Sequence, residues 1–181
     1  MATSPKLSLN SGSKLPDPTM YRSVVGSLQY LAFTCPDISY SVNRLSQYMH
    51  MPTDEHWKAA KRILRYLNCT SSHGICLRRE NPFQLHAYSD ADWAGDTDDF
   101  VSTNAYIVYL GYNPMSWTSK KQRGVVRSST EDEYRSVSNT SSEVMWVCSL
   151  LRELGVSLPQ VPTRDTQVLT RFNKYFVANT S

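Results

Sequence analysis

The sequence predicts an α+β fold, in which a small helical unit precedes an antiparallel sheet and one long helix. Two observations predict it. Over residues 19–70 the apolar side chains recur every three or four positions, as they do in helices that bury one face. From His73 onward, short segments alternate with period two and are rich in aromatic and β-branched residues, which is typical of half-buried strands. A chain of 181 residues can bury one sizeable core of this kind.

Three helices are expected in the helical unit, after a flexible segment at residues 1–18 that is rich in Ser, Pro and Lys. The first covers Tyr21–Phe33. The second begins after Asp37 as its N-cap and runs to about Tyr48. The third opens at Pro52 and carries apolar residues at helical spacing, namely Trp57, Ala60, Ile63, Leu64 and Leu67.

A second region, residues 71–170, is expected to form the sheet and its helix. A long helix is predicted from Glu131 to about Leu154, where Gly155 acts as a stop signal. A further strand is expected near Arg164 to Leu169, and residues 171–181 are unpatterned and expected to be unstructured. The expected strands of an antiparallel meander are residues 74–79, 84–93, 104–112 and 114–121.

Composition restricts the classes of function. The net charge of +3 suits a nucleic-acid partner without requiring one. Neither a signal peptide nor a run of about 20 apolar residues is seen, so we expect an intracellular protein, cytoplasmic or nuclear, that is neither secreted nor bound to a membrane. The four cysteines form no C-x-x-C pair, which argues against a zinc ribbon. One basic stretch is a candidate for binding phosphates, or simply a solubilising loop: Lys120, Lys121, Arg123 and Arg127.

The stretch HAYSDADWAGDTDD, His86–Asp99, concentrates five aspartates. A calcium loop of the EF-hand type is excluded because Ala94 and Val101 stand where it needs oxygen ligands. A metal-dependent nuclease would need Asp90 at the end of a core strand beside another carboxylate. The other four aspartates are expected to be solvent-facing turn residues rather than metal ligands: Asp92, Asp96, Asp98 and Asp99. For Asp92, a place next to the metal site is left open.

Glu133 is the best second carboxylate, because it lies in the first turn of the long helix. It has a competing structural role. Thr130 and Glu133 fit the capping box S/T-x-x-E, in which the glutamate only accepts the N-cap amide. Local pattern alone favours the cap.

Several long motifs, in order, resemble the C-terminal part of plant copia-type LTR retrotransposon polyproteins over roughly residues 5–162. They include PDPTMYRSVVGSLQYLAFTCPDISYSVNRLSQYMHMPTDEHWKAAKRILRYL, HAYSDADWAGDTDD, SWTSKKQRGVVRSSTEDEYRSV and WVCSLLRELG. The resemblance implies a reverse-transcriptase tail followed by a ribonuclease H-like domain with a mixed sheet. It implies Asp90 and Glu133 as catalytic residues, whereas the third family carboxylate, in a C-D-N motif, is replaced by PTRDTQV, where Asp165 lies about two residues early.

The resemblance therefore predicts an endoribonuclease that uses Mg²⁺ or Mn²⁺ held by Asp90, Glu133 and Asp165. Its expected partner is a duplex that contains RNA, either an RNA-DNA hybrid or double-stranded RNA, the latter as antiviral defence by a domesticated fragment. The family's polymerase carboxylates lie upstream of the residues present, so no DNA synthesis is expected. The alternative is a non-catalytic retrotransposon relic that binds nucleic acid or protein.

Overall fold

The structure, a computed structural model, describes residues 7–156, 158 and 168–169. It confirms the α+β prediction and divides into two compact units. The helical unit is Met1–Ile75 together with Asp96–Phe100, and the sheet unit is Cys76–Gly95 together with Val101–Ser181. Among the described residues, no helix has the length and apolar character needed to cross a membrane.

Three α-helices form the helical unit: α1 (Thr19–Leu31), α2 (Ser39–Ser46) and α3 (Asp54–Cys69). A short 3₁₀ helix, Pro36–Ile38, leads into α2, so Asp37 is not its N-cap as predicted. The helical spacing of apolar residues places their side chains in one core, which explains why these segments fold together. The buried members of this core are Tyr21, Val25, Leu28, Ile38, Val42, Leu45, Ala60 and Ile63.

The second half of the segment expected to be flexible is instead hydrogen-bonded to the start of α3. Leu15 donates its amide to the carbonyl of Pro52 at 3.0 Å, and Asp54 donates its amide to the carbonyl of Ser13 at 2.9 Å. These bonds satisfy main-chain groups that precede a helix, where the helix itself provides no partners. Residues 1–6 lie outside the described part of the chain.

The sheet contains three antiparallel strands, β1 (Leu85–Asp92), β2 (Thr103–Leu110) and β3 (Asn113–Lys121). A two-residue strand, β4 (Val168–Leu169), pairs parallel to β1 and gives the order β3-β2-β1-β4. The prediction of a strand at residues 74–79 is wrong, because these residues form no strand. There the Asn113 side chain accepts the amide of Arg78 at 2.8 Å and donates to its carbonyl at 3.0 Å, so a side chain replaces a strand partner.

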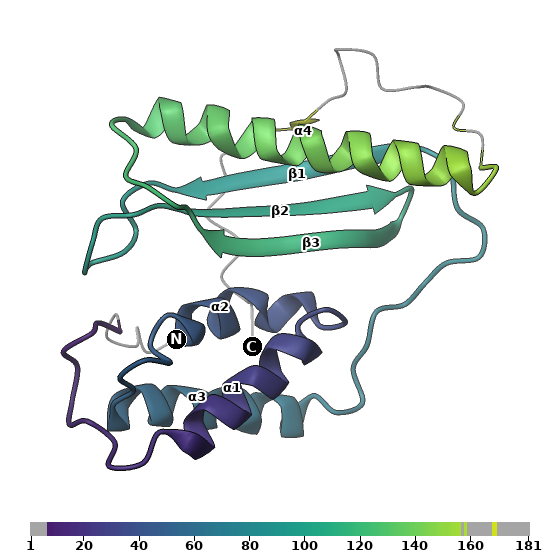
Figure 1. Cartoon of the computed structure of the whole chain (residues 1–181). Coiled ribbons are helices and arrows are strands. Elements are labelled where there is room, and N and C mark those ends of the chain that lie inside the picture. Colours follow the sequence, from purple (N-terminus) through teal and green to yellow (C-terminus); the bar gives the residue numbers. More distant parts are fainter. Residues whose placement is uncertain (1–6, 157, 159–167, 170–181) are drawn as a thin grey trace. The chain divides into compact units, whose positions relative to one another are not determined.

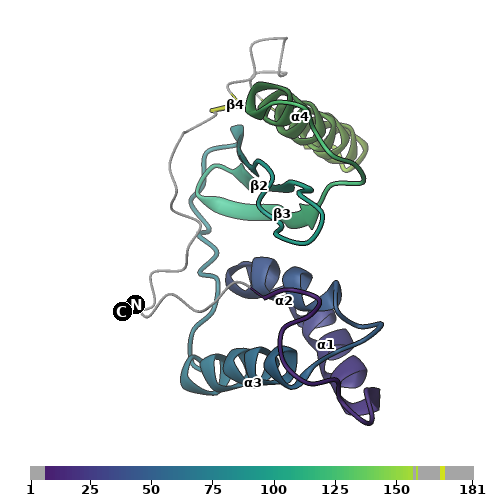
Figure 2. The same cartoon turned by 90° about the vertical axis from the view of Figure 1, so that its left-hand side faces the viewer.

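One long helix, α4 (Ser129–Glu153), lies over one face of the sheet, as both views show (Figures 1 and 2). Alternate residues of each strand point toward it. The resulting core of the sheet unit consists of Ala87, Val108, Val144 and Cys148. This packing fixes the first turn of α4 close to the C-terminal end of β1, where the candidate site lies.

Candidate functional site

Asp90 lies on β1, two residues before the strand ends, and its side chain is exposed. It pairs with Ala105 on β2. Its main-chain carbonyl accepts a hydrogen bond of 3.0 Å from the hydroxyl of Ser136, in the second turn of α4. The main chain of Asp90 therefore meets α4, whereas its side chain, three positions after the core residue Ala87, lies on the opposite face of the sheet from α4.

The cap of α4 differs from the predicted one. Ser128 is the N-cap, and its hydroxyl accepts the amide of Glu131 at 3.2 Å. Glu131 in turn accepts the amide of Arg127 at 3.2 Å and pairs with Arg135 at 2.7 Å. The capping-box interpretation of Thr130 and Glu133 is thus wrong, and Glu133, which is half-exposed, is not used by the cap.

The carboxylate of α4 that faces inward is Asp132, which the sequence reasoning missed. Asp132 has an exposed fraction of 0% and lies one helical turn before Ser136. One of its oxygens accepts the side-chain amide of Gln122, which also donates to Asn104 at 2.6 Å. Its other oxygen, Oδ2, is buried and has no hydrogen-bond partner among the residues that the structure describes. A buried carboxylate with an unsatisfied oxygen lowers the stability of the folded state, because the oxygen loses its hydrogen bonds to water without gaining a protein donor.

The acidic groups of the site repel one another. Although Asp90 is exposed, partial desolvation by the surrounding protein raises the pKa of its carboxylate above the ordinary value, and the negative charges of Asp92 and Asp132 raise it further. Burial likewise raises the pKa of Asp132, against the hydrogen bonds from Ser102 and Gln122 that lower it, and the charge of Asp92 adds to the increase. The positive charge of Arg135 opposes the increase at Asp132, but it is the smallest of these contributions, and the pKa of Asp132 stays raised.

The turn after β1 is built around the remaining aspartates. The Asp92 carboxylate lies against Gly95, so a side chain at this position would require the carboxylate to move. Asp96 accepts the amide of Asp98 at 2.9 Å, so the prediction of turn chemistry is confirmed there. Asp96 is nevertheless buried and ion-paired with Arg44 within the helical unit, so the solvent-facing part of that prediction is wrong.

The basic stretch is held near the same strand ends. The indole of Trp93 donates a hydrogen bond of 3.2 Å to the carbonyl of Val126. Lys121 pairs with Thr103, which pairs on its other side with Asp92, so two strand spacings, about 10 Å, separate Lys121 from Asp92. The other candidate phosphate-binding side chains are exposed: Lys120, Arg123 and Arg127.

No group of three or more His, Cys, Asp or Glu side chains converges as a metal site within residues 7–156, 158 and 168–169. Asp165, the third predicted ligand, lies outside these residues. The donor chemistry still fits a hard divalent cation. Carboxylate oxygens are the ligands that Mg²⁺ and Mn²⁺ prefer, and the unpartnered Oδ2 of Asp132 is an orphaned buried acceptor, but among the described residues it does not converge with Asp90 and Asp92 into a group of three.

Comparison with known proteins gives strong matches in sequence. The chain is 74% identical over 162 residues to the retrovirus-related Pol polyprotein from transposon RE2 of Arabidopsis thaliana. It is 73% identical over 162 residues to the corresponding polyprotein from transposon RE1 of the same plant. Each match covers 90% of this chain but only 11% of the polyprotein, so the chain spans about a ninth of the length of these relatives.

A third relative is much shorter. The chain is 45% identical over 128 residues to the secreted RxLR effector protein 161 of Plasmopara viticola, and the match covers 70% of this chain and 90% of that protein. No protein-family model matches the chain. No solved structure matches it either.

Proposed function

This chain belongs to the family of retrovirus-related Pol polyproteins of plant copia-type transposons, and we propose that it is a divalent-metal-dependent endoribonuclease of the ribonuclease H type. Its proposed substrate is the RNA strand of a duplex. The observation that carries this proposal is the hydrogen bond between Ser136 and the main chain of Asp90, because it sets the acidic first turn of α4 beside the strand that bears the predicted catalytic aspartate.

In the proposed site, Asp90, Glu133 and Asp165 would hold the ion. When bound, Mg²⁺ or Mn²⁺ supplies Lewis-acid activation of water and neutralises charge on the phosphodiester. Glu133 suits this role because the cap of α4 is made by Ser128 and Glu131 and leaves its carboxylate available. Glu133 stands in the second turn of α4, one position after the buried Asp132, and the proposal requires its side chain to reach toward the end of β1.

The basic residues of the proposed site would bind the substrate backbone. Lys120 and Lys121 are the last two residues of β3, and Arg123 and Arg127 follow in the loop that Trp93 connects to the end of β1 by a hydrogen bond. Cations in such a loop would contact phosphates across the groove of an A-form duplex, which proteins recognise mainly by shape and by backbone contacts. These contacts position the duplex and do not select a sequence.

A second candidate is a non-catalytic module that binds nucleic acid. The observation in its favour is that Asp132, and not Glu133, is the carboxylate of α4 whose charge acts on Asp90. Such a module would bind a duplex through the basic loop, with an affinity that falls steeply as salt rises. Substitutions at Asp90 would not change this affinity.

The test is a cleavage assay on the purified chain with end-labelled RNA-DNA hybrid, double-stranded RNA and single-stranded RNA, in Mg²⁺ and in Mn²⁺. We expect cleavage of the RNA strand in at least one duplex and little loss of single-stranded RNA. Asp90→Asn and Glu133→Gln should each reduce the rate by about two orders of magnitude or more, since catalytic carboxylates of this kind contribute at least that factor.

Glu153→Gln is the matched control, because it neutralises an exposed carboxylate in the last turn of the same helix. It should retain the full rate. Cleavage that survives both site substitutions would come from a contaminating nuclease and would refute the proposal. Salt-dependent duplex binding without cleavage, unchanged in Asp90→Asn, would establish the binding module instead.

A further inference from the structure

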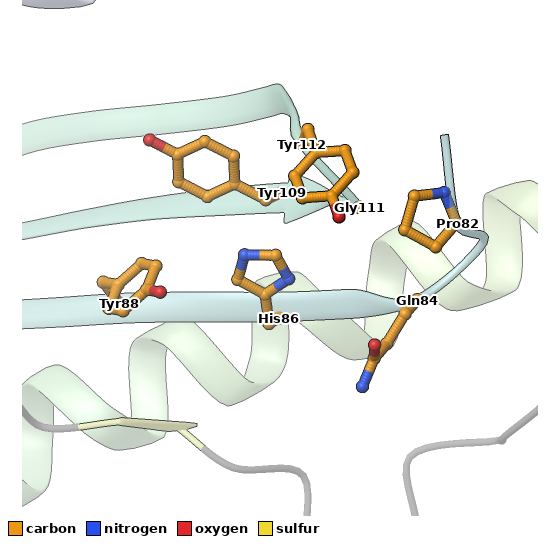
Figure 3. Close-up of a pocket in the computed structure, with 7 residues that line it drawn as sticks. All are labelled: Pro82, Gln84, His86, Tyr88, Tyr109, Gly111 and Tyr112. Carbon is orange, nitrogen blue, oxygen red and sulfur yellow. The ribbon is translucent and has the colours of Figure 1, made fainter. Parts of the chain in front are cut away.

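The sheet unit contains a second feature that the proposed cleavage site does not use, an open pocket of about 460 Å³ at the start of β1. Figure 3 shows aromatic rings gathered over two adjacent strands, with the amide of a glutamine at the rim. This volume falls in the range of ligand-binding clefts, about 300 to 1,000 Å³. The pocket is lined by Pro82, Gln84, His86, Tyr88, Tyr109, Gly111 and Tyr112.

The rings of the pocket form a connected cluster. His86 stacks on Tyr109 with centroids 5.2 Å apart and an interplanar angle of 3°, and Tyr88 meets Tyr109 edge-on at 6.0 Å. His86 and Tyr109 are directly paired neighbours on β1 and β2, so the sheet itself holds the two rings parallel. Tyr112, by contrast, is 61% exposed and stands at the open edge.

Hydrogen bonds to Asn81 build the rim. Its side chain donates to the carbonyl of Leu110 and accepts the amide of Tyr112, both at 2.7 Å. Gly111, between these two residues, has a φ of +57°, and a side chain there would collide with Asn81. The Arg78 guanidinium lies 5.1 Å from the centre of the Tyr112 ring. The rim therefore presents an exposed aromatic ring with a cation over one of its faces.

We propose that this pocket binds an unpaired nucleobase of a nucleic-acid strand. Exposed aromatic faces stack on bases of any sequence, and a neighbouring arginine can contact the phosphate that follows the base. The Gln84 amide and the His86 imidazole offer donors and acceptors to the edge of a base. The inference goes beyond the proposed cleavage, because stacking requires neither a metal ion nor a scissile bond.

Charge favours a nucleic acid over a proline-rich peptide, the other ligand that aromatic grooves commonly bind. No carboxylate lines the pocket, and the adjoining segment Arg78-Arg79-Glu80 carries two positive charges and one negative charge. Alternate residues of a strand share one face, so Asp90 follows Tyr88 on the pocket side of β1, about 7 Å farther along. A nucleic-acid strand whose unpaired end is bound in the pocket would therefore run along this face toward Asp90 of the proposed cleavage site.

The test measures binding by fluorescence anisotropy in EDTA, so that cleavage plays no part. The probes are a blunt labelled duplex and the same duplex with a four-nucleotide overhang, made once of RNA and once of DNA. The overhang should tighten binding about five-fold or more, which corresponds to the lower end of the range of stacking energies for one base on an aromatic side chain. A gain with both overhangs shows that the base, and not the ribose, is bound.

Tyr112→Ala should abolish this gain, and Tyr112→Phe should keep it because the ring remains. Tyr134→Ala is the control, since Tyr134 is an exposed tyrosine (73%) of the same unit on α4. His86→Ala provides a second variant inside the pocket. Equal affinity for blunt and overhanging duplexes would overturn the proposal, as would a gain that persists in both pocket variants, or displacement of the overhang by a proline-rich decapeptide. Loss of cleavage with the overhang gain intact would count against the proposed nuclease alone.

Discussion

The hydroxyl of Ser136 donates a hydrogen bond of 3.0 Å to the main-chain carbonyl of Asp90. This single contact joins the second turn of α4 to the strand that carries the predicted catalytic aspartate. Ser136 is buried on the same face of α4 as Asp132, Thr140 and Val144, so the helix packs through small and polar side chains where it crosses the site. The position of the acidic first turn relative to β1 thus depends on a contact between a side chain and the main chain.

Ser136→Ala is expected to lower the free energy of unfolding by about 1 kcal/mol, the usual net value of one such hydrogen bond. Urea denaturation followed by circular dichroism measures it. If the bond also positions the proposed site, the cleavage rate should fall further than the population of folded protein does. Ser138→Ala removes an exposed hydroxyl from the same helix and should change neither quantity. An unchanged rate and stability in Ser136→Ala would show that the contact is dispensable.

Asp132→Asn is expected to stabilise the protein at pH 7. The pKa of Asp132 is raised in the folded state, mainly by burial, so ionisation costs folding free energy as the pH rises from 3.8, the ordinary value, through the raised value. The asparagine carries no charge, and the gain should therefore vanish below pH 3.8. Urea midpoints of wild type and variant between pH 3 and pH 7 measure the difference.

The same variant separates the roles of the two adjacent acids. If Glu133 is the catalytic carboxylate, Asp132→Asn should retain cleavage whereas Glu133→Gln should lose it. The reverse result would assign catalysis to Asp132 and refute the role proposed for Glu133. Equal stability at pH 7 would contradict the expected cost of the buried charge.

The helices, the strands of the meander and the position of Asp90 could be predicted because each depends on local periodicity. The spacing of apolar residues identifies α1, α3 and α4, and alternation identifies β1 to β3. The cap of α4 could not be predicted from local patterns. Two overlapping patterns, Ser128-x-x-Glu131 and Thr130-x-x-Glu133, fit a capping box equally well, and only the true start of the helix decides between them.

Long-range partners account for the other differences. Residues 74–79 have the composition of a strand, but the main chain of Arg78 is bonded to a side chain 35 positions away. Asp96 looks like an ordinary turn residue until Arg44, 52 positions earlier, is placed beside it. From its sequence neighbours, Asp132 would be expected to be an exposed helical acid. Only the folded structure shows that the side-chain amide of Gln122 donates a hydrogen bond to it in the interior.

Arg44→Met is expected to destabilise the helical unit strongly. The ion pair of Arg44 and Asp96 is largely buried, with exposed side-chain fractions of 14% and 2%, and removing one partner leaves a buried charge without compensation. Such losses cost about 3 to 5 kcal/mol. Asp96→Asn should have a similar effect, and the double variant should lose less than the sum of the two. Asp98→Asn is the charge-matched control, because Asp98 is exposed and its asparagine can still accept the amide of Leu9. Additive losses in the double variant would mean that the two residues do not interact.

Acidification is expected to weaken the helical unit through His56. This imidazole is buried, stacks on Tyr48 at 3.9 Å and accepts the amide of Thr53 at Nδ1, which requires the neutral ring. Burial is the main cause that lowers the pKa of His56 below 6.5, although the carbonyl of Ser8 opposes it. The stability is therefore fully present above pH 6.5 and is lost as the pH falls through the folded-state value.

The measurement is the melting temperature of α-helical circular dichroism between pH 7.5 and pH 5, together with the chemical shifts of the His56 ring. His50→Gln is the control, because it removes an exposed histidine of the same unit, and it should keep the decline. His56→Gln should flatten this part of the pH profile while lowering stability at pH 7.5, because the capping contact with Thr53 is weakened. A His56 ring that titrates at or above 6.5, or a wild-type melting temperature that does not change over this range, would contradict the assigned role of the buried neutral imidazole.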